Sequence, residues 1–248
     1  MLKSTDILSI QLFYDIDKNI INFFNGHLSH SYEAFYNFHF ISGDHLFKGG
    51  ILMFIFFYAW FKEGVGDVGR NRALLLTTLF ASMAAMAVSR GLTNFLPFNP
   101  RPLFDKSLHY FDFPINEFGF DKLSSFPSDH AVLFTALSTG ILMITRRLGI
   151  FALTYTIIFI LFPRLYLGYH WPSDIIAGII VGALTTFLCL KSRLITQIIE
   201  KPCSILLQKY PEIFYGLLFL LCYQIADMFD ASRQLGGFVI HVFMQLFG

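Results

Sequence analysis

The chain has 248 residues, of which 55% are hydrophobic and 14% are charged, and its mean hydropathy is +0.58. Soluble domains carry about 25% charged residues, so this composition excludes an ordinary soluble protein and indicates one embedded in lipid. The formal net charge of +1 gives no basis for nucleic-acid binding. The 3 cysteines have neither the spacing of a disulfide framework nor that of a metal site.

The first 48 residues mix apolar and polar positions at roughly helical spacing. Asp15, Asp17 and Lys18 interrupt the apolar pattern, so neither half of this segment is long enough to cross a bilayer. We expect residues 1–48 to form an amphipathic segment that lies in the membrane interface. A soluble-type helix packed on the membrane domain is the alternative. No cleavable signal peptide is expected here.

Charge-poor apolar runs follow, and each predicts a membrane helix. They cover residues 49–61, 73–89, 131–145, 148–163, 175–190 and 213–226. Each is shorter than the roughly 20 residues that a span requires, so polar residues at its ends must complete it. The sequence therefore predicts an all-α membrane bundle of five to six transmembrane helices. Residues 49–191 form its core, and residues 192–248 form a C-terminal membrane segment, whose last apolar stretch has no assigned orientation.

Basic residues cluster in alternate loops between these runs. They are Lys62, Arg70 and Arg72, then Arg146 and Arg147, then Lys191 and Arg193. Alternate loops share one side of the membrane, and the positive-inside tendency makes that side cytoplasmic. The other loops, residues 90–127 and 164–174, then share the outer face of the cell membrane. Arg101 and Arg164 oppose the tendency there, which indicates a task other than topology.

The first polar motif of the outer face runs from Asn94 to Pro102. Pro100 and Pro102 hold Arg101 in extended backbone. A guanidinium group there can bind an anion through two parallel hydrogen bonds. The alternative is an arginine that only sets topology or contacts lipid headgroups.

The second motif, Phe126-Pro127-Ser128-Asp129-His130, directly precedes an apolar run. Ser128 is a natural N-cap, and Asp129 suits the positive end of the helix dipole. The N–H groups of the first helical turn can bind an anion. His130 is placed to give a proton to a departing oxygen. Simple capping beside an interfacial histidine is the alternative.

The third motif runs from Arg164 to Asp174. Pro172 suits the first turn of a helix, which places His170 beside the cap and Asp174 one turn further on. The carboxylate is then close enough to hold an imidazole N–H. A histidine oriented by a carboxylate, with an arginine nearby, is what phosphoryl transfer requires. An interfacial histidine and a capping aspartate are the alternative.

Together the three motifs resemble those of the type 2 phosphatidic acid phosphatase superfamily, which includes membrane lipid phosphatases and shares its site with vanadium haloperoxidases. The family patterns are Lys-x6-Arg-Pro, Pro-Ser-Gly-His and Ser-Arg-x5-His-x3-Asp. The matching stretches are Arg101-Pro102, Pro127 to His130, and Arg164 with His170 and Asp174. Asn94 stands where the family has lysine, Asp129 where it has glycine and Pro163 where it has serine. Arg90, about one helical turn before Asn94, is another candidate cation.

The resemblance implies a phosphatase for a lipid phosphate or diphosphate, similar to bacterial undecaprenyl-diphosphate phosphatase-like members. It implies that His170 attacks phosphorus to give a phosphohistidine, that Asp174 orients it and that His130 protonates the leaving oxygen. Arg101, Ser128, Asp129, Arg164 and Asn94 are the expected phosphate-binding residues. No metal or other cofactor is expected. The expected partners are the lipid substrate and membrane lipids, without nucleic acid, and the oligomeric state is open.

Other functions remain compatible with the motifs. A phosphotransferase that moves a phosphoryl group from a polyprenyl diphosphate to lipid A is one alternative. Hydrolysis of phosphatidate, phosphatidylglycerol phosphate or lipid A is another. A non-catalytic membrane protein that binds or transports anionic lipids would use Arg101 and Arg164, but it would have no use for the spacing of His170 and Asp174.

Overall fold

The computed structural model describes residues 4–28, 31–62, 68–108 and 122–247, and these residues are helical over most of their length. The elements in chain order are α1 (Ser4–His27), α2 (Tyr32–Gly43), the π-helical turn η1 (Leu46–Gly50), α3 (Ile51–Phe61), α4 (Val68–Phe95), the 3-10 turn η2 (Pro102–Phe104), α5 (Asp129–Ile144), α6 (Arg146–Tyr155), the π-helical turn η4 (Thr156–Leu161), α7 (Phe162–Tyr166), α8 (Pro172–Lys191), α9 (Arg193–Lys209), α10 (Pro211–Ala226) and α11 (Asp230–Phe247). The predicted all-α architecture is confirmed.

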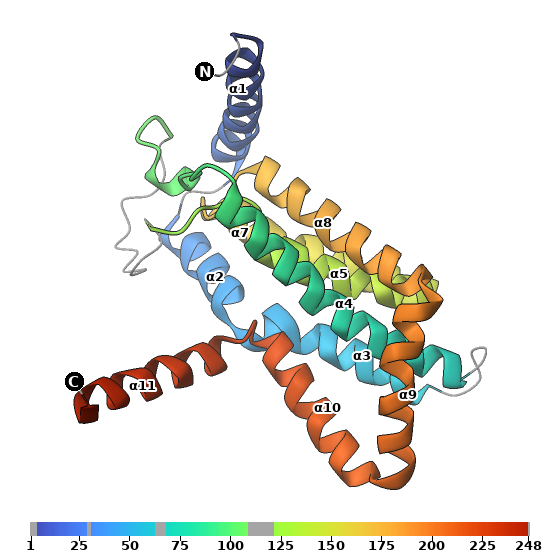
Figure 1. The fold of residues 1–248 in the computed structure, drawn as a ribbon. Helices are drawn as coiled ribbons and strands as arrows, with labels where there is room; N and C mark the ends of the chain where they lie inside the picture. The colour runs from blue at the N-terminus through green and yellow to red at the C-terminus, as the bar shows by residue number, and fades with distance from the viewer. Residues whose placement is uncertain (1–3, 29–30, 63–67, 109–121, 248) are drawn as a thin grey trace.

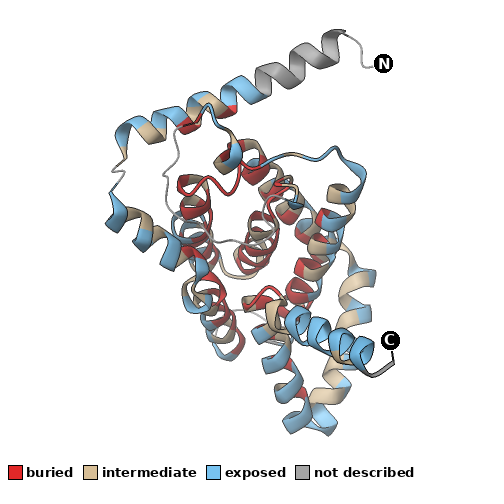
Figure 2. Cartoon of the chain, turned by 90° about the vertical axis from the view of Figure 1, so that its left-hand side faces the viewer, coloured by how far each residue is buried: buried red, intermediate tan, exposed pale blue. Residues whose placement is uncertain are grey.

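Helices α4, α5 and α8 pack against one another and form the centre of the molecule (Figure 1). Every side chain of α5 from Ala131 to Ser138 is buried, and the buried residues gather in these central helices (Figure 2). A helix that is apolar and covered on all sides belongs in the interior of a bundle. The second motif ends in the first turn of α5 and the third motif ends in the first turn of α8, so this packing brings the two motifs together.

Two glycines of α8 allow α5 to approach closely. Gly178 and Gly182 are four residues apart and therefore lie on one face of the helix. A Cβ atom on Gly182 would lie 2.2 Å from the carbonyl oxygen of Val132, and one on Gly178 would lie 2.6 Å from the Cβ atom of Ala131. Neither position has room for a side chain. Such pairs of small residues let the backbones of membrane helices make extensive van der Waals contact.

The described helices Gly69–Phe95, Arg146–Tyr166 and Pro172–Lys191 are long and apolar enough to cross a membrane. Two bent pairs raise the number to as many as 5 if each pair is one span: α2 with η1 and α3, bent by 60°, and α10 with α11, bent by 91°. The shorter α5, with 16 residues, is also apolar. The chain is therefore a multi-pass membrane protein with a helical bundle.

Helix α2 lies within the segment that we expected to be interfacial, yet it qualifies as part of a span when it is joined to α3. The polar residue Asp44 does not end the helical structure at this point. Its side-chain Oδ1 accepts hydrogen bonds from the N–H groups of Leu46 and Phe47 at 2.9 and 3.1 Å. The carboxylate therefore begins a new helical turn after a bend. The positions of the apolar runs in the sequence do not reveal this continuation.

The three motifs and the basic residues of the alternate loops lie at opposite ends of the bundle. Arg70 and Arg72 fall in the first turns of α4, Arg146 begins α6 and Lys191 ends α8. The first motif follows the other end of α4, and the second and third motifs precede α5 and α8 (Figure 1). The bundle thus has one end with the basic residues of the alternate loops, here called the basic end, and one end that carries the motifs.

The two terminal regions pack around the motif end. Asp17 of α1 contacts Ser173 at the start of α8. At the other terminus, α10 and α11 meet at Met228 and Phe229, whose φ angles are 56° and 63°. From this bend α11 extends away from the bundle (Figure 1). Residues far outside the three motifs therefore lie close to them.

Candidate active site

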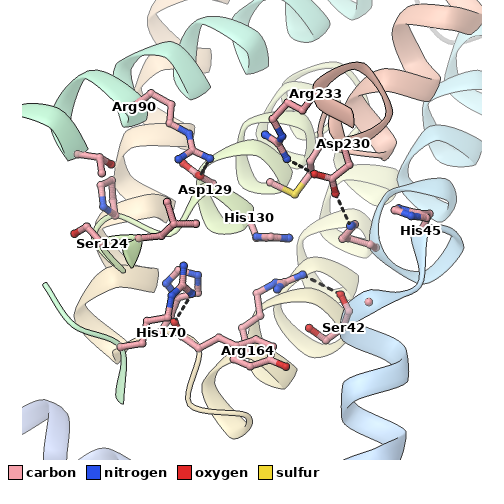
Figure 3. Close-up of a pocket in the computed structure, with 18 of the residues that line it drawn as sticks. Ser42, His45, Arg90, Ser124, Asp129, His130, Arg164, His170, Asp230 and Arg233 are labelled. Atoms are coloured by element: carbon pink, nitrogen blue, oxygen red, sulfur yellow. Dashed lines mark hydrogen bonds and ion pairs between the residues drawn. The ribbon is translucent and has the colours of Figure 1, made fainter. Parts of the chain in front are cut away.

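A cavity of about 500 Å³ lies at the motif end of the bundle (Figure 3). Residues from all three motifs line it: Arg101, Asp129, His130, Arg164 and His170. The packing of α4, α5 and α8 brings these positions together, although Arg101 and His170 are 69 positions apart in the sequence. A shared cavity is the first requirement for joint action on one ligand.

The buried ring of His170 is oriented by a backbone carbonyl. Its Nδ1 lies 3.0 Å from the carbonyl oxygen of Ser125. Because a carbonyl only accepts hydrogen bonds, Nδ1 must carry a proton in this contact, and Nε2 of the neutral ring then has the lone pair. Oδ2 of Asp174 lies further away, 3.6 Å from Nδ1. Asp174 therefore acts on the imidazole mainly as a nearby negative charge, with Ser125 as the closer acceptor.

The electrostatic surroundings of His170 favour its neutral form. Burial is the largest influence and lowers the pKa of His170 below its ordinary value. Asp174 raises that pKa and offsets part of the effect, whereas Arg101 and Arg164 lower it. A neutral imidazole is the form that can attack an electrophilic phosphorus.

Asp174 is fully buried and its carboxylate is held by two donors. Oδ2 accepts the N–H of Trp171 at 2.8 Å, and Oδ1 accepts Nδ2 of Asn99 at 3.2 Å. The backbone carbonyl of Asp174 also accepts the N–H of Ser128 at 3.1 Å. Asp174 thus links the start of α8 to the second motif and to the loop that carries Arg101. Our sequence analysis did not identify Asn99; its position next to Pro100-Arg101 was the available signal.

Arg101 has the extended backbone that the flanking prolines predict, with φ −73° and ψ 149°. Its Nη1 donates to the carbonyl oxygen of Tyr169 at 2.8 Å. One residue earlier, the carbonyl of Pro100 accepts Nε1 of Trp171 at 2.8 Å. The first motif is therefore fixed to the loop before α8, and the buried guanidinium group of Arg101 is held beside His170.

The second motif begins α5 as its sequence predicts. Ser128 is the N-cap, and its side chain accepts the N–H of Ala131. Ser128 is buried and is not one of the residues that line the cavity. The carboxylate of Asp129 lies 2.5 Å from Nη2 of Arg90 and accepts Oγ of Ser89 at 2.9 Å. Arg90 therefore neutralises the carboxylate that replaces the glycine of the family pattern.

The remaining predicted residues differ in their position. The ring of His130 lines the cavity, in the first turn of α5. Asn94 is exposed near the end of α4 and does not line the cavity. Arg90, one turn earlier, does line it. The catalytic and phosphate-binding roles of these residues stay predictions.

A second part of the cavity wall comes from segments that our sequence analysis treated as interfacial or terminal. Its residues are His39, Ser42, Gly43, His45, Lys48, Met228, Asp230 and Arg233. One of them positions a motif residue: the backbone carbonyl of Ser42 accepts Nη2 of Arg164 at 3.0 Å. The role of a backbone carbonyl cannot be recognised from the sequence. Lys48, a basic residue at the edge of an apolar run, was a signal that this segment contributes to the site.

The charge of the cavity wall suits an anion. Lysine and arginine side chains outnumber carboxylates: Lys48, Arg90, Arg101, Arg164 and Arg233 stand against Asp129 and Asp230. Excess positive charge in a partly enclosed cavity concentrates anionic ligands. The described residues form no group of three or more His, Cys, Asp or Glu side chains that can hold a metal ion.

An all-α bundle with these three motifs around a basic cavity defines a class of membrane phosphatase. The profile of the PAP2 superfamily matches residues 72–196, which make up half of the chain and include Arg101, His130, Arg164, His170 and Asp174. The protein belongs to the PAP2 superfamily, so the family inferred from the motifs is confirmed.

Among curated proteins, the chain is similar to one from Escherichia coli (strain K12) that carries the provisional name undecaprenyl-diphosphatase YbjG. The two sequences are 29% identical over 93 residues, which cover 38% of this chain and 46% of YbjG. The chain thus spans about half the length of this relative. No solved structure matches the chain significantly.

Proposed function

We propose that this protein hydrolyses undecaprenyl diphosphate to undecaprenyl phosphate and inorganic phosphate at the outer face of the cell membrane. The observation that supports this best is the single cavity lined by Arg101, His130, Arg164 and His170. The name of YbjG supports the choice of lipid. The basic residues at the opposite end of the bundle support the outer face.

In the first step, Nε2 of His170 attacks the terminal phosphorus. A phosphorus–nitrogen bond forms while the bond from phosphorus to the bridging oxygen breaks, and His130 gives a proton to the departing lipid phosphate. Asp174 stabilises the positive charge that develops on the imidazole ring of His170. Arg101 and Arg164 stabilise the oxygens of the transferred phosphoryl group.

In the second step, water replaces the histidine. His130, now neutral, accepts a proton from a water molecule as the water oxygen attacks phosphorus. The phosphorus–nitrogen bond breaks, inorganic phosphate leaves and His170 regains its neutral ring. We infer that the reaction is metal-independent, with the guanidinium groups supplying the positive charge that Mg²⁺ supplies in kinases.

Phosphate release by the purified protein in detergent tests this function. The substrates are undecaprenyl diphosphate, phosphatidate and phosphatidylglycerol phosphate, each with and without excess EDTA. We expect the fastest release from undecaprenyl diphosphate, unchanged by EDTA and inhibited by orthovanadate, which mimics five-coordinate phosphorus. A loss of activity with EDTA that Mg²⁺ restores would contradict the metal-free mechanism.

Two further outcomes of the assay would replace the proposal. Appearance of the phosphoryl group on added lipid A, in place of free phosphate, would identify a phosphotransferase. Binding of these lipids with no turnover of any of them would identify an anionic-lipid-binding or transport protein.

A further inference from the structure

The part of the cavity wall outside the PAP2 match comes from α2, η1 and the junction of α10 with α11. We infer that it forms a second anion subsite, in which Lys48 binds the lipid-side phosphate of a diphosphate substrate. This inference rests on the proposed function and adds to it the residue that distinguishes a diphosphate from a monophosphate.

The position of Lys48 is fixed by the backbone around it. Lys48 lies in the π-helical turn η1, its side chain lines the cavity and the residue is 6% exposed. The next residue, Gly49, packs so closely against α10 that a Cβ atom there would lie 2.4 Å from the backbone of Ala226. Single π-helical turns in longer helices frequently occur at functional sites. Here the turn brings a lysine and the end of α10 to the same cavity.

The charge of Lys48 is weakly compensated within the described part of the chain. The carboxylate within ion-pair distance is that of Asp230, and its Oδ2 lies 3.9 Å from Nζ. Asp230 makes a much closer contact with Arg233. Arg164, another buried cation of the same cavity, also acts electrostatically on Lys48. Asp227 also acts electrostatically on Lys48, but its carboxylate lies 2.9 Å from Nδ1 of His45. A buried cation whose nearby carboxylates contact other groups more closely gains free energy when an anion binds beside it.

The order of the side chains across the cavity indicates which phosphate of a diphosphate lies beside Lys48. His130 lies between His170 on one side and Asp230 on the other (Figure 3). With the terminal phosphate at His170 and the bridging oxygen at His130, the lipid-side phosphate extends toward Asp230 and Lys48. This phosphate gains negative charge when the bridging bond breaks. A nearby ammonium group therefore stabilises the transition state more than the bound substrate.

Matched substrates test the assignment. Farnesyl diphosphate and farnesyl phosphate have the same isoprenoid chain and differ by one phosphate group. We expect Lys48→Met to reduce kcat/KM for the diphosphate about 100-fold and that for the monophosphate only about threefold, because a buried charge contact is lost only with the diphosphate. Lys48→Arg, which keeps the charge, should retain most of the selectivity. Lys62→Met changes an exposed lysine after α3 and serves as the control.

A second measurement is independent of turnover. Binding of methylenediphosphonate and of inorganic phosphate is followed by calorimetry on the full-length protein. Lys48→Met should abolish the preference of the wild type for the diphosphonate. Asp230→Asn should bind the diphosphonate several-fold more tightly than the wild type, because the competing carboxylate is removed, and misfolding cannot produce such a gain.

The outcomes separate the subsite from the proposed function. Equal losses on both farnesyl substrates, or no loss on either, would overturn the role of Lys48. Equal binding of diphosphonate by the wild type and by Lys48→Met would overturn it as well. A wild type that binds the diphosphonate through Lys48 but hydrolyses no lipid diphosphate would leave the subsite in place and overturn the proposed phosphatase.

Discussion

At the scale of single residues, the site is organised by backbone carbonyl groups. His170 donates to Ser125, Arg101 to Tyr169 and Arg164 to Ser42, at 3.0, 2.8 and 3.0 Å. Each contact is buried and orients a nitrogen-containing side chain, and the two guanidinium groups keep their positive charge. A carboxylate in the same place would form an ion pair and weaken the attraction for a phosphate. The carbonyl contacts therefore fix the geometry of the site while its positive charge is retained.

Replacement of His170 tests the nucleophile. We expect His170→Ala to reduce phosphate release at least about 1,000-fold, since loss of a catalytic nucleophile removes the covalent route. Release of phosphate from undecaprenyl diphosphate, together with elution as a single peak in detergent, measures activity and folding. His27→Ala, which changes an exposed histidine in the last turn of α1, should behave as the wild type. More than about a tenth of normal turnover in His170→Ala would be incompatible with a phosphohistidine mechanism.

The pH profile tests the ionisation of His170. The attacking form is neutral, so kcat/KM should fall as the pH decreases through the pKa of His170. Burial lowers this pKa, so the acid limb of the profile should lie below the ordinary histidine pKa of about 6.5. Asp174→Asn should move the limb to still lower pH, because Asp174 raises the pKa, and should slow turnover. An acid limb above pH 7 in the wild type would argue against the assignment.

At the scale of the elements, α1 supports the start of α8 from outside the bundle. The carboxylate of the buried Asp17 accepts the N–H and Oγ of Ser173 at 3.0 and 2.5 Å. Burial raises the pKa of Asp17, and the hydrogen bonds from Ser173 oppose that change. These bonds satisfy donors in the first turn of α8, which have no partner inside the helix. Helix α1 thus supports the turn that carries Asp174.

A second link joins α1 to the loop after the first motif. Asp105 accepts Tyr14 at 2.5 Å and lies 3.2 Å from Nζ of Lys18. Burial raises the pKa of Asp105, but hydrogen bonds from Tyr14, Ser107 and Lys18 outweigh it and lower the pKa to about 2. Asp105 is therefore ionised at neutral pH, and α1 contacts both the start of α8 and the loop after the first motif.

The close packing of α5 and α8 can be tested with one methyl group. Gly182→Ala places a Cβ atom 2.2 Å from the carbonyl oxygen of Val132, so the helices must separate. We expect a cost of about 1–3 kcal/mol, as for other overpacked interiors, seen as a lower Tm in detergent and as reduced turnover. Gly216→Ala in α10 is the matched control, because nothing lies within 4 Å of its added methyl group. Equal Tm values for the two variants would show that α5 and α8 are not in such close contact.

At the scale of the whole molecule, local signals in the sequence predicted much of the structure. Apolar runs located the helices, and proline and capping rules placed Ser128 at an N-cap and Pro172 in a first turn. The supporting contacts were not predictable in this way. Asp17 acts on a residue 156 positions away, and Ser125 and Ser42 act through backbone carbonyls, which every residue type has. Lys48 lines the cavity because the chain bends near Asp44, and this bend was not predicted.

Cysteine labelling tests the orientation of the whole bundle. Lys106→Cys lies at the motif end and Arg147→Cys at the basic end, and both positions are exposed. In a background with Cys189, Cys203 and Cys222 changed to serine, a membrane-impermeant maleimide should label only Lys106→Cys in intact spheroplasts. Detergent should expose Arg147→Cys to the reagent and confirm that it can react. The opposite pattern would place the cavity on the cytoplasmic side and remove the outer-leaflet substrate.

The shared cavity wall also determines when the site is complete during synthesis. Ser42 and Lys48 enter the membrane early, the histidines follow, and Asp230 and Arg233 come after them. When the growing chain has left the ribosome up to the end of α8, it contains all three motifs. It still lacks the part of the cavity wall that comes from the α10–α11 junction. Residues up to Arg233 must therefore be synthesised before the cavity wall is complete. The binding site is finished only when the last helices are in place.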